Sequence, residues 1–193
     1  MELFEAIYGR RSIGKVKQEP IARETIERIL EAGTWAPNHR LTEPWRFFVM
    51  TGEGRNKLGG AYAAIALTGE AAKESEESLT KAEAARKKAY RAPLVIGVAV
   101  EPQNRAGVIE IEEYGAVFSA VQNMLLAVHA LNLAAVWRTG EPCYHPLMNE
   151  AFGLREQDRM LGLLYIGEPD MAPPAPRREP ASSKTVWIED GES

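Results

Sequence analysis

Residues 94–100 read LVIGVAV, an uninterrupted apolar run that follows Pro93. A run of this length without polar alternation is typical of a strand that is covered on both of its faces. It therefore predicts the central strand of a small sheet with helices on either side. Shorter apolar runs at residues 47–50, 134–137 and 163–166 are the candidates for the remaining strands.

Helical patterns occupy much of the chain between these strands. Apolar residues recur at helical spacing in residues 2–8 and 26–33, and residues 53–67 are also predicted to be helical. In residues 111–131 the apolar positions run around nearly the whole helix, which predicts a core helix. Polar residues in that segment argue against a membrane span, and its alanines allow a close neighbour, for which a second subunit is one candidate. Helices around a small sheet define an α+β fold.

The composition is that of an ordinary soluble protein. The chain has 193 residues, 45% hydrophobic and 26% charged, which suits a single domain over residues 1–193. The net charge of −4 disfavours general nucleic-acid binding and attachment to a membrane surface. The single cysteine, Cys143, excludes an internal disulfide and suits the reducing cytoplasm. The first eight residues also lack the cationic start of a signal peptide, so we expect a cytoplasmic location.

Two segments have a composition of their own. Residues 69–91 are rich in Ala, Glu and Lys, which favours an exposed helical excursion or a lid over the rest of the domain, with disorder as the alternative. Residues 171–193 begin with four prolines before residue 181, and this predicts an extended C-terminal arm.

The sequence lacks the local signatures of several enzyme classes. Its three histidines show no helical i, i+4 pair and there is no second cysteine, so no metal site is expected. It also lacks the G-x-S-x-G elbow, the P-loop and the G-x-G-x-x-G fingerprint. Cys143 stands two residues before His145, but catalytic triads are arrangements in space, and closeness along the chain does not make one.

Three cationic segments remain as candidates for a binding site. They are Arg10-Arg11-Ser12, Pro37-Asn38-His39-Arg40 and Trp137-Arg138-Thr139-Gly140, and each stands at the end of a predicted element. Guanidinium groups together with a hydroxyl hold a phosphate in a fixed geometry. For each segment by itself, a solvent-facing surface is the alternative, because surface arginines are common.

Taken in order along the chain, these segments resemble the nitroreductase family of FMN-dependent oxidoreductases, and its compact branch above all. The resemblance runs along nearly the whole sequence. After RRS at residues 10–12, it is carried by the motifs at residues 24–33 (ETIERILEAG), 36–49 (AP…EPWRFFV), 91–96 (RAPLVI), 137–140 (WRTG) and 161–169 (LGLLYIGEP).

The resemblance implies a nitroreductase-like fold, with a small mixed and mainly antiparallel sheet flanked by helices. It further implies an interlocked homodimer with FMN at the subunit interface. By resemblance, the first segment holds the FMN phosphate and ribityl chain, His39 reaches FMN from the partner with Trp35 beside it, and the WRT segment lies at the flavin. The residues to which the resemblance assigns FMN contacts are Arg10, Arg11, Ser12, Trp35, His39, Trp137, Arg138 and Thr139.

The activity that the resemblance implies is a ping-pong reaction. NADH or NADPH gives a hydride to FMN, and a nitroaromatic, quinone or related acceptor then takes it. No side-chain acid or base is required, so we assign no catalytic residue. Two alternatives stay open: a flavin enzyme of the same fold that catalyses dehalogenation or ene reduction, and a module that binds or stores FMN without turnover. The sequence specifies neither the acceptor nor the preferred nicotinamide.

The chain departs from the wider family where a positive charge is expected to face the flavin ring. Many members carry a lysine two residues after the serine, whereas this chain has Gly14 followed by Lys15. Lys15 and Arg138 are the alternative sources of that charge. Where many members read N-x-Q before Pro-Trp, this chain has LTE at residues 41–43. The larger members of the family close the phosphate site with a basic pair near the C-terminus. In this chain the candidates for that role are Arg177, Arg178 and Lys184.

Overall fold

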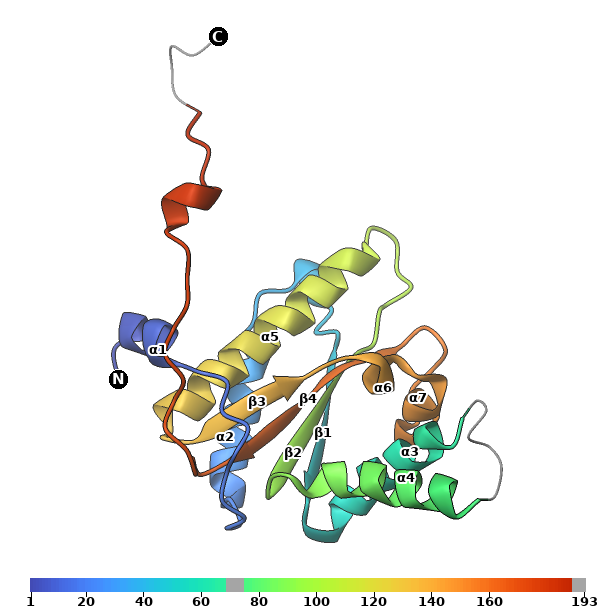
Figure 1. Cartoon of the computed structure of the whole chain (residues 1–193). Helices are drawn as coiled ribbons and strands as arrows, with labels where there is room; N and C mark the ends of the chain where they lie inside the picture. The colour runs from blue at the N-terminus through green and yellow to red at the C-terminus, as the bar shows by residue number, and fades with distance from the viewer. Residues whose placement is uncertain (69–74, 189–193) are drawn as a thin grey trace.

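The apolar run at residues 94–100 forms β2 (Leu94–Val100), and all seven of its residues are buried. In the computed structural model, which describes residues 1–68 and 75–188, β2 lies inside a four-stranded sheet with the order β1-β2-β4-β3. The other strands are β1 (Trp45–Thr51), β3 (Ala134–Arg138) and β4 (Arg159–Gly167). Each of the predicted strands is therefore confirmed, and the fold is α+β as expected (Figure 1).

All named strands pair antiparallel, and one further pairing makes the sheet mixed. β1 pairs with β2 from Trp45 opposite Val100 to Thr51 opposite Leu94. At the other edge, β3 pairs with β4, and Ser12 adds a parallel bridge to Ala135. The amide of Ile13 donates to the carbonyl of Ala135 over 2.9 Å. The segment that follows the first helix is thus fixed along the outer edge of β3.

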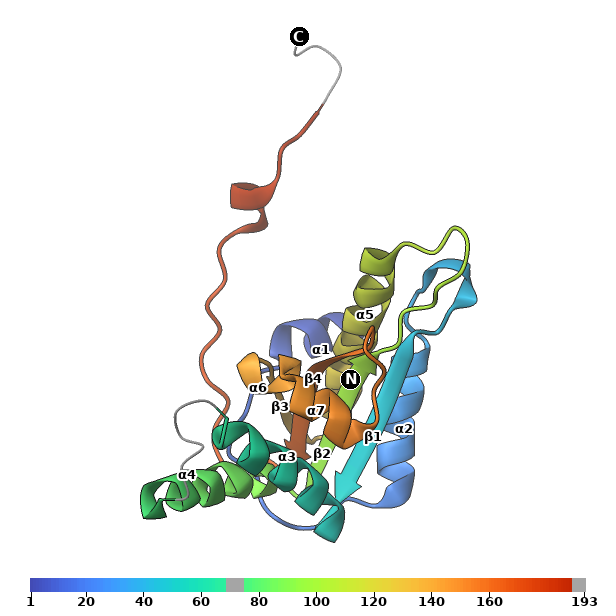
Figure 2. The ribbon, with the colours of Figure 1, turned by 90° about the vertical axis from the view of Figure 1, so that its right-hand side faces the viewer.

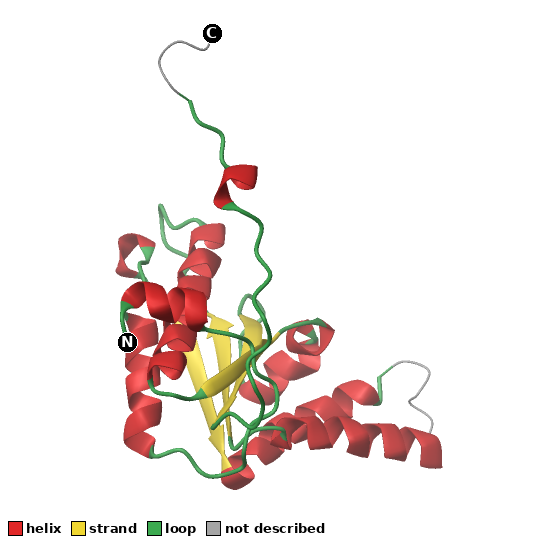
Figure 3. Ribbon diagram, turned by 60° about the vertical axis from the view of Figure 1, so that its left-hand side comes forward, coloured by secondary structure: helices red, strands yellow, loops and turns green. Residues whose placement is uncertain are grey.

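Helices cover both faces of the sheet (Figures 2 and 3). One face packs against α2 and α5, and the other against α3, α6 and α7, with α4 lying on α3. The α-helices are α1 (Leu3–Gly9), α2 (Arg23–Thr34), α3 (Asn56–Ala66), α4 (Glu76–Arg86), α5 (Glu110–Ala130), α6 (Glu141–Tyr144) and α7 (Pro146–Phe152). The short 3-10 helices are η1 (His39–Leu41), η2 (Gly52–Arg55), η4 (Lys87–Tyr90) and η5 (Ala181–Lys184).

The long helix α5 is the core helix that its sequence predicts, with Val117, Val121 and Met124 fully buried. Ala116 and Ala120 are also buried within this chain, so the neighbours they admit belong to the same subunit. What α5 leaves exposed instead is large and apolar: Ile111 is 77% and Phe118 42% exposed. Across residues 1–68 and 75–188, none of the helices combines the length and the apolar character needed to span a membrane.

Residues 75–90 of the Ala-, Glu- and Lys-rich segment form α4 and η4, while residues 69–74 lie outside the described part of the chain. One side of α4 is buried through Ser78, Ala82 and Ala85. Gly59 of α3 allows the two helices to approach, because a Cβ there would lie 3.3 Å from the Arg86 carbonyl oxygen. The described part of the segment thus packs along α3, and its role as a lid remains a proposal.

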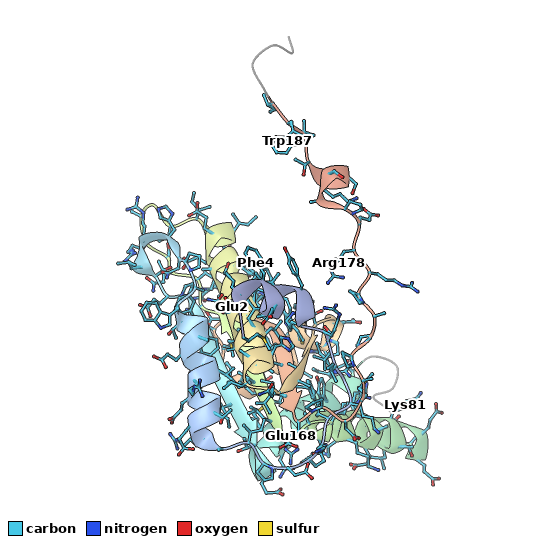
Figure 4. All side chains as sticks on the ribbon, turned by 90° about the vertical axis from the view of Figure 1, so that its left-hand side faces the viewer. Glu2, Phe4, Lys81, Glu168, Arg178 and Trp187 are labelled. Carbon is cyan, nitrogen blue, oxygen red and sulfur yellow. The ribbon has the colours of Figure 1, made fainter. Side chains whose placement is uncertain are left out.

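The chain after β4 leaves the domain as an arm (Figures 1 and 4). It starts beside the first cationic segment, where Lys15 pairs with Asp170 at 2.9 Å. Arg11 Nε donates to the Pro174 carbonyl over 3.2 Å. Further out, Val186, Trp187 and Ile188 are each at least 75% exposed. Residues 189–193, the end of the predicted arm, lie outside the described residues.

The packing of β3 on β4 depends on one glycine. A Cβ at Gly162 would overlap the indole of Trp137, which lies directly over this glycine. We expect Gly162→Ala to lower the free energy of unfolding by about 1–3 kcal/mol, the usual cost of overpacking. Gly60→Ala is the matched control, because Gly60 lies within α3 and a Cβ there meets nothing within 4 Å. That control should be neutral or slightly stabilising. Urea unfolding measures both, and equal effects would contradict the packing argument.

Candidate functional site

Two of the three cationic segments meet at the outer edge of β3. The bridge between Ser12 and Ala135 places the first segment along the strand that ends in Trp137 and Arg138. A Cβ at Gly14 would lie 3.7 Å from the Arg138 guanidinium. Position 14 therefore lies within van der Waals contact of the Arg138 side chain. Since Lys15 is paired with Asp170, Arg138 is the better placed of the two candidate charges.

Arg10 and Arg11 have different surroundings. Arg11 donates to the carbonyls of Tyr8 and Arg10, at 2.6 and 2.8 Å, and so holds the chain after α1 in place. The guanidinium of Arg10 makes no hydrogen bond to any residue that the structure describes. Partial burial, together with the charges of Arg178 and Arg11, lowers the pKa of Arg10 below its ordinary value. A cation crowded by like charges is stabilised by an anion, which points to Arg10 as an anion ligand.

A cavity of about 320 Å³ opens beside these arginines, at the C-terminal end of α5. Its walls come from the first segment, from the end of α5 and from the start of the arm. The residues that line it include Arg10, Arg11, Ile13, His129, Asn132 and Met171. His129 lies against Gly9, where a Cβ would come within 3.0 Å of its Nε2.

A second cavity, of about 510 Å³, lies at the end of β3. It gathers three cations, Lys88, Arg91 and Arg138, together with Trp137 and Thr139. Buried Nε of Arg138 has no hydrogen-bond partner within residues 1–68 and 75–188. A buried donor without a partner is costly, so a bound acceptor would stabilise this part of the protein.

Lys88 and Arg91 are site residues that sequence reasoning missed. They belong to the charge-rich segment 69–91, which resembles a solvated surface. The signal that distinguishes them is their position shortly before the buried strand β2, which places them at one end of the sheet.

Two buried tyrosines form part of the wall of the second cavity. The hydroxyl groups of Tyr62 and Tyr165 share a hydrogen bond of 3.1 Å, and the Arg138 guanidinium lies 5.5 Å from the centre of the Tyr165 ring. Burial raises the pKa of both phenols above the ordinary value. Both hydroxyls therefore stay protonated at neutral pH, where they can donate hydrogen bonds but cannot act as bases.

The third segment lies at the opposite end of α5 (Figure 2). His39 Nδ1 contacts Glu112 Oε2 at 2.5 Å, whereas Gly9 contacts His129. Glu112 and His129 are about 25 Å apart at the helical rise of 1.5 Å per residue. Trp35, which follows α2, is 80% exposed. A single chain therefore aligns two segments along the edge of β3, and leaves His39 at the other end of α5. The aligned residues are Arg10, Arg11, Ser12, Trp137, Arg138 and Thr139; the exposed Trp35 lines neither of the two cavities.

The remaining candidate chemistry is a thiol. Cys143 is buried, and its Sγ donates to the Arg138 carbonyl at a distance of 3.7 Å. Burial raises the pKa of this thiol to about 11, which makes it a poor nucleophile at neutral pH. In the described ranges, no three His, Cys, Asp or Glu side chains are grouped so as to hold a metal ion.

With the geometry established, comparison with known proteins identifies the family. The family model described as "Nitroreductase family" matches residues 7–168. The chain is 34% identical over 171 residues to a protein of Escherichia coli (strain K12) that is provisionally named NAD(P)H nitroreductase YdjA. This match covers 89% of this chain and 90% of that protein. The chain therefore belongs to the nitroreductase family, and it is a nitroreductase-like oxidoreductase.

Solved structures agree with this assignment. The nitroreductase-like family protein from Bacillus cereus superposes with a TM-score of 0.84 at 30% identity, covering 98% of this chain and 97% of that one. A provisionally named nitroreductase from Desulfovibrio desulfuricans, crystallised in complex with FMN, has a TM-score of 0.68 at 26% identity and covers 98% of both chains. The resemblance inferred from the sequence motifs is confirmed.

The environment of Cys143 predicts its reactivity. With a pKa near 11, only about one thiol in a thousand is ionised at pH 8. We expect the native protein to react with Ellman's reagent far more slowly than the protein unfolded in urea, where the thiol returns to its ordinary pKa and is exposed. Absorbance of the released thiolate measures both rates. Rapid, complete labelling of the native protein would show that the thiol is accessible and ionised.

Proposed function

We propose that this protein is a cytoplasmic FMN-dependent oxidoreductase, which takes hydride from NADH or NADPH and reduces nitroaromatic, quinone or related acceptors. Membership of the nitroreductase family supports the class of reaction. The FMN complex of the structural relative from D. desulfuricans supports the cofactor. The lone cysteine supports the reducing compartment.

The observation that carries the proposal is the alignment of the segments that carry Arg10, Ser12 and Arg138 along the edge of β3. FMN has a phosphate at one end and a ring that gains negative charge on reduction at the other. Arg10, Arg11 and Ser12 offer two guanidinium groups and a hydroxyl for the phosphate. The cations of the second cavity, with the unpartnered Arg138 Nε among them, suit the ring end. The residues present therefore fit the cofactor.

When bound, FMN supplies the hydride-accepting centre of the reaction. The chain contributes binding and charge. Arg138, beside Lys88 and Arg91, favours a reduced and negatively charged ring over a neutral one. Tyr62 and Tyr165 keep their protons, and Cys143 keeps its own, so these three groups remove no proton from a substrate at neutral pH. We therefore assign no catalytic acid or base.

We further propose that the active form is a homodimer with FMN at the interface. In one chain, His39 contacts Glu112, which lies about 25 Å along α5 from His129 in the cavity of Arg10 and Arg11. His39, and Trp35 near it in the sequence, can therefore join the site only if a second copy supplies them. Large apolar side chains suited to an interface are exposed on α1, on the outer side of α5 and on the arm: Leu3, Phe4, Tyr8, Ile111, Phe118 and Trp187. In such a dimer the described part of the arm, residues 171–188, would pack on the partner. The segment of α4 and η4 would serve as a lid over the second cavity, which Lys88 of η4 lines.

The cofactor and reductant can be tested on the purified protein. We expect it to bind FMN, to lose its yellow colour under anaerobic conditions when NADH or NADPH is added, and to recover the colour when a nitroarene or quinone follows. Absorbance near the flavin maximum measures each step. Colour that neither nicotinamide bleaches would favour an FMN-binding module without turnover. Bleaching followed by reoxidation only with a halogenated or ene substrate would favour a flavin enzyme that catalyses dehalogenation or ene reduction. A protein that does not bind FMN would refute the proposed function and both alternatives.

The composite site predicts complementation between two defective variants. Arg10→Ala should weaken FMN binding by about 2 kcal/mol, close to 30-fold in the dissociation constant, because a charge-assisted contact to the phosphate is lost. His39→Ala should also weaken binding while the protein remains dimeric. A heterodimer of the two variants, made by co-expression with different tags, has one site with both side chains intact. It should hold about half the flavin of the wild-type dimer.

The two parent homodimers are the controls for this experiment, since neither has an intact site. A heterodimer that holds no more flavin than its parents would show that Arg10 and His39 do not act in one site across the interface. Unchanged affinity in Arg10→Ala would instead reject the phosphate role of Arg10 by itself.

A further inference from the structure

The loop that contains His39 has an unusual backbone. Arg40, Leu41 and Glu43 have φ angles of 56°, 52° and 46°, which lie in the left-handed region that favours glycine. None of these positions is a glycine, and Leu41 carries a branched side chain. Such a conformation persists only where the surrounding structure holds it, and in folded proteins it is concentrated at functional sites.

A buried carboxylate holds this loop from inside the domain. Glu113, in the first turn of α5, is 1% exposed. Its Oε1 accepts a hydrogen bond from the Thr42 hydroxyl at 2.6 Å, and its Oε2 accepts one from the backbone N–H of Gln103 at 3.3 Å. The Gln103 side chain in turn donates to the Thr42 carbonyl at 2.8 Å. Thr42, which lies between the left-handed residues, is therefore fixed through both its side chain and its backbone.

The loop held in this way exposes most of the surface of its side chains at positions 39 and 41. Leu41 is 83% exposed, and the side chain of His39 is 52% exposed. Burying a carboxylate is expensive even when it is hydrogen-bonded. Core formation does not account for that cost here, because the side chains next to Thr42 point out of the domain. The arrangement makes sense if the outward-facing residues must keep one conformation.

His39 is held from a second direction. Glu112, next to Glu113 on α5, contacts Nδ1 of the imidazole at 2.5 Å. This contact orients the ring and leaves Nε2 as the nitrogen available to a ligand. Two adjacent carboxylates of α5 thus have different roles. Glu113 fixes the backbone of the loop, and Glu112 fixes the imidazole ring of His39.

We propose that Glu113 is a positioning residue of the flavin site, which holds residues 38–43 in the strained conformation that presents His39 to the FMN of the partner subunit. The proposal rests on the proposed function. It adds a residue in the core of one subunit that governs cofactor affinity in the other. The physical basis is preorganisation: a loop already fixed in its bound conformation loses less entropy when it meets the ligand.

The test compares variants of Glu113 by FMN titration of the apoprotein. We expect Glu113→Ala to raise the dissociation constant about tenfold, because the loop must then be ordered on binding. Glu113→Gln keeps a side-chain oxygen for Thr42 and should recover much of the affinity. Thr42→Val removes the hydroxyl donor with little change of shape, and it should also raise the dissociation constant for FMN. It serves as the test variant if Glu113→Ala folds poorly.

Two further measurements separate positioning from general stability. In a His39→Ala background, Glu113→Ala should have little further effect on FMN affinity, because the side chain that it positions is already gone. Trypsin should cleave after Arg40 faster in apo Glu113→Ala than in the wild-type apoprotein. Asp158, another fully buried carboxylate, pairs with Arg155 outside the proposed site. Asp158→Asn is therefore the matched control and should leave FMN affinity within about twofold while lowering stability.

The outcomes distinguish this role from the proposed function. If the wild-type apoprotein binds FMN and Glu113→Ala binds it equally well, the positioning role is wrong and the proposed function stands. The role is also wrong if Glu113→Ala weakens binding to the same extent with and without His39. If the wild-type apoprotein takes up no FMN, the proposed function fails and this role for Glu113 fails with it.

Discussion

The candidate site depends on the pairing of Ser12 with Ala135 at the edge of β3. An edge strand has unpaired amide and carbonyl groups, and covering them with a short extended segment satisfies part of that row. In this protein the covering segment comes from the end of α1 and carries Arg10, Arg11 and Ser12. The same backbone pairing that completes the sheet therefore aligns two cationic segments, more than a hundred residues apart in sequence, along one line that ends at Arg138.

The length of α5 imposes the second constraint. Its C-terminal end packs near Arg10 and its N-terminal end holds His39, so the helix keeps the two parts of the predicted site apart within one chain. A core helix that is apolar around most of its circumference cannot bend to bring them together without exposing buried side chains such as Val117. Association of two copies, with the apolar residues left exposed on α1 and α5 at the interface, is the arrangement that uses both parts.

Much of the fold could be predicted from the sequence, because β2 and α5 carry strong local patterns. The uninterrupted apolar run gave the central strand, and the all-round pattern gave the core helix. Lys88 and Arg91 escaped prediction because a charge-rich helix has the same composition whether it faces solvent or a cavity. Glu113 escaped because an acidic residue in the first turn of a helix is common for reasons of the helix dipole alone. Its burial depends on where the loop at Thr42 packs, and that is a tertiary contact.

The site also shows why a protein of net charge −4 gathers so many cations at one edge. Arg10, Arg11 and Arg178 repel one another, which is why the pKa of Arg10 is lowered in addition to the effect of its burial. Arg138 keeps a buried donor, Nε, that finds no partner among the residues the structure describes. Both features make the ligand-free protein less stable than it would be with neutral residues there, and both are relieved by a bound anion. A ligand that binds only the folded state stabilises it by mass action. The strain at this edge, like the strain in the loop at Thr42, is therefore best understood as a property of the folded protein with its cofactor rather than of the chain alone.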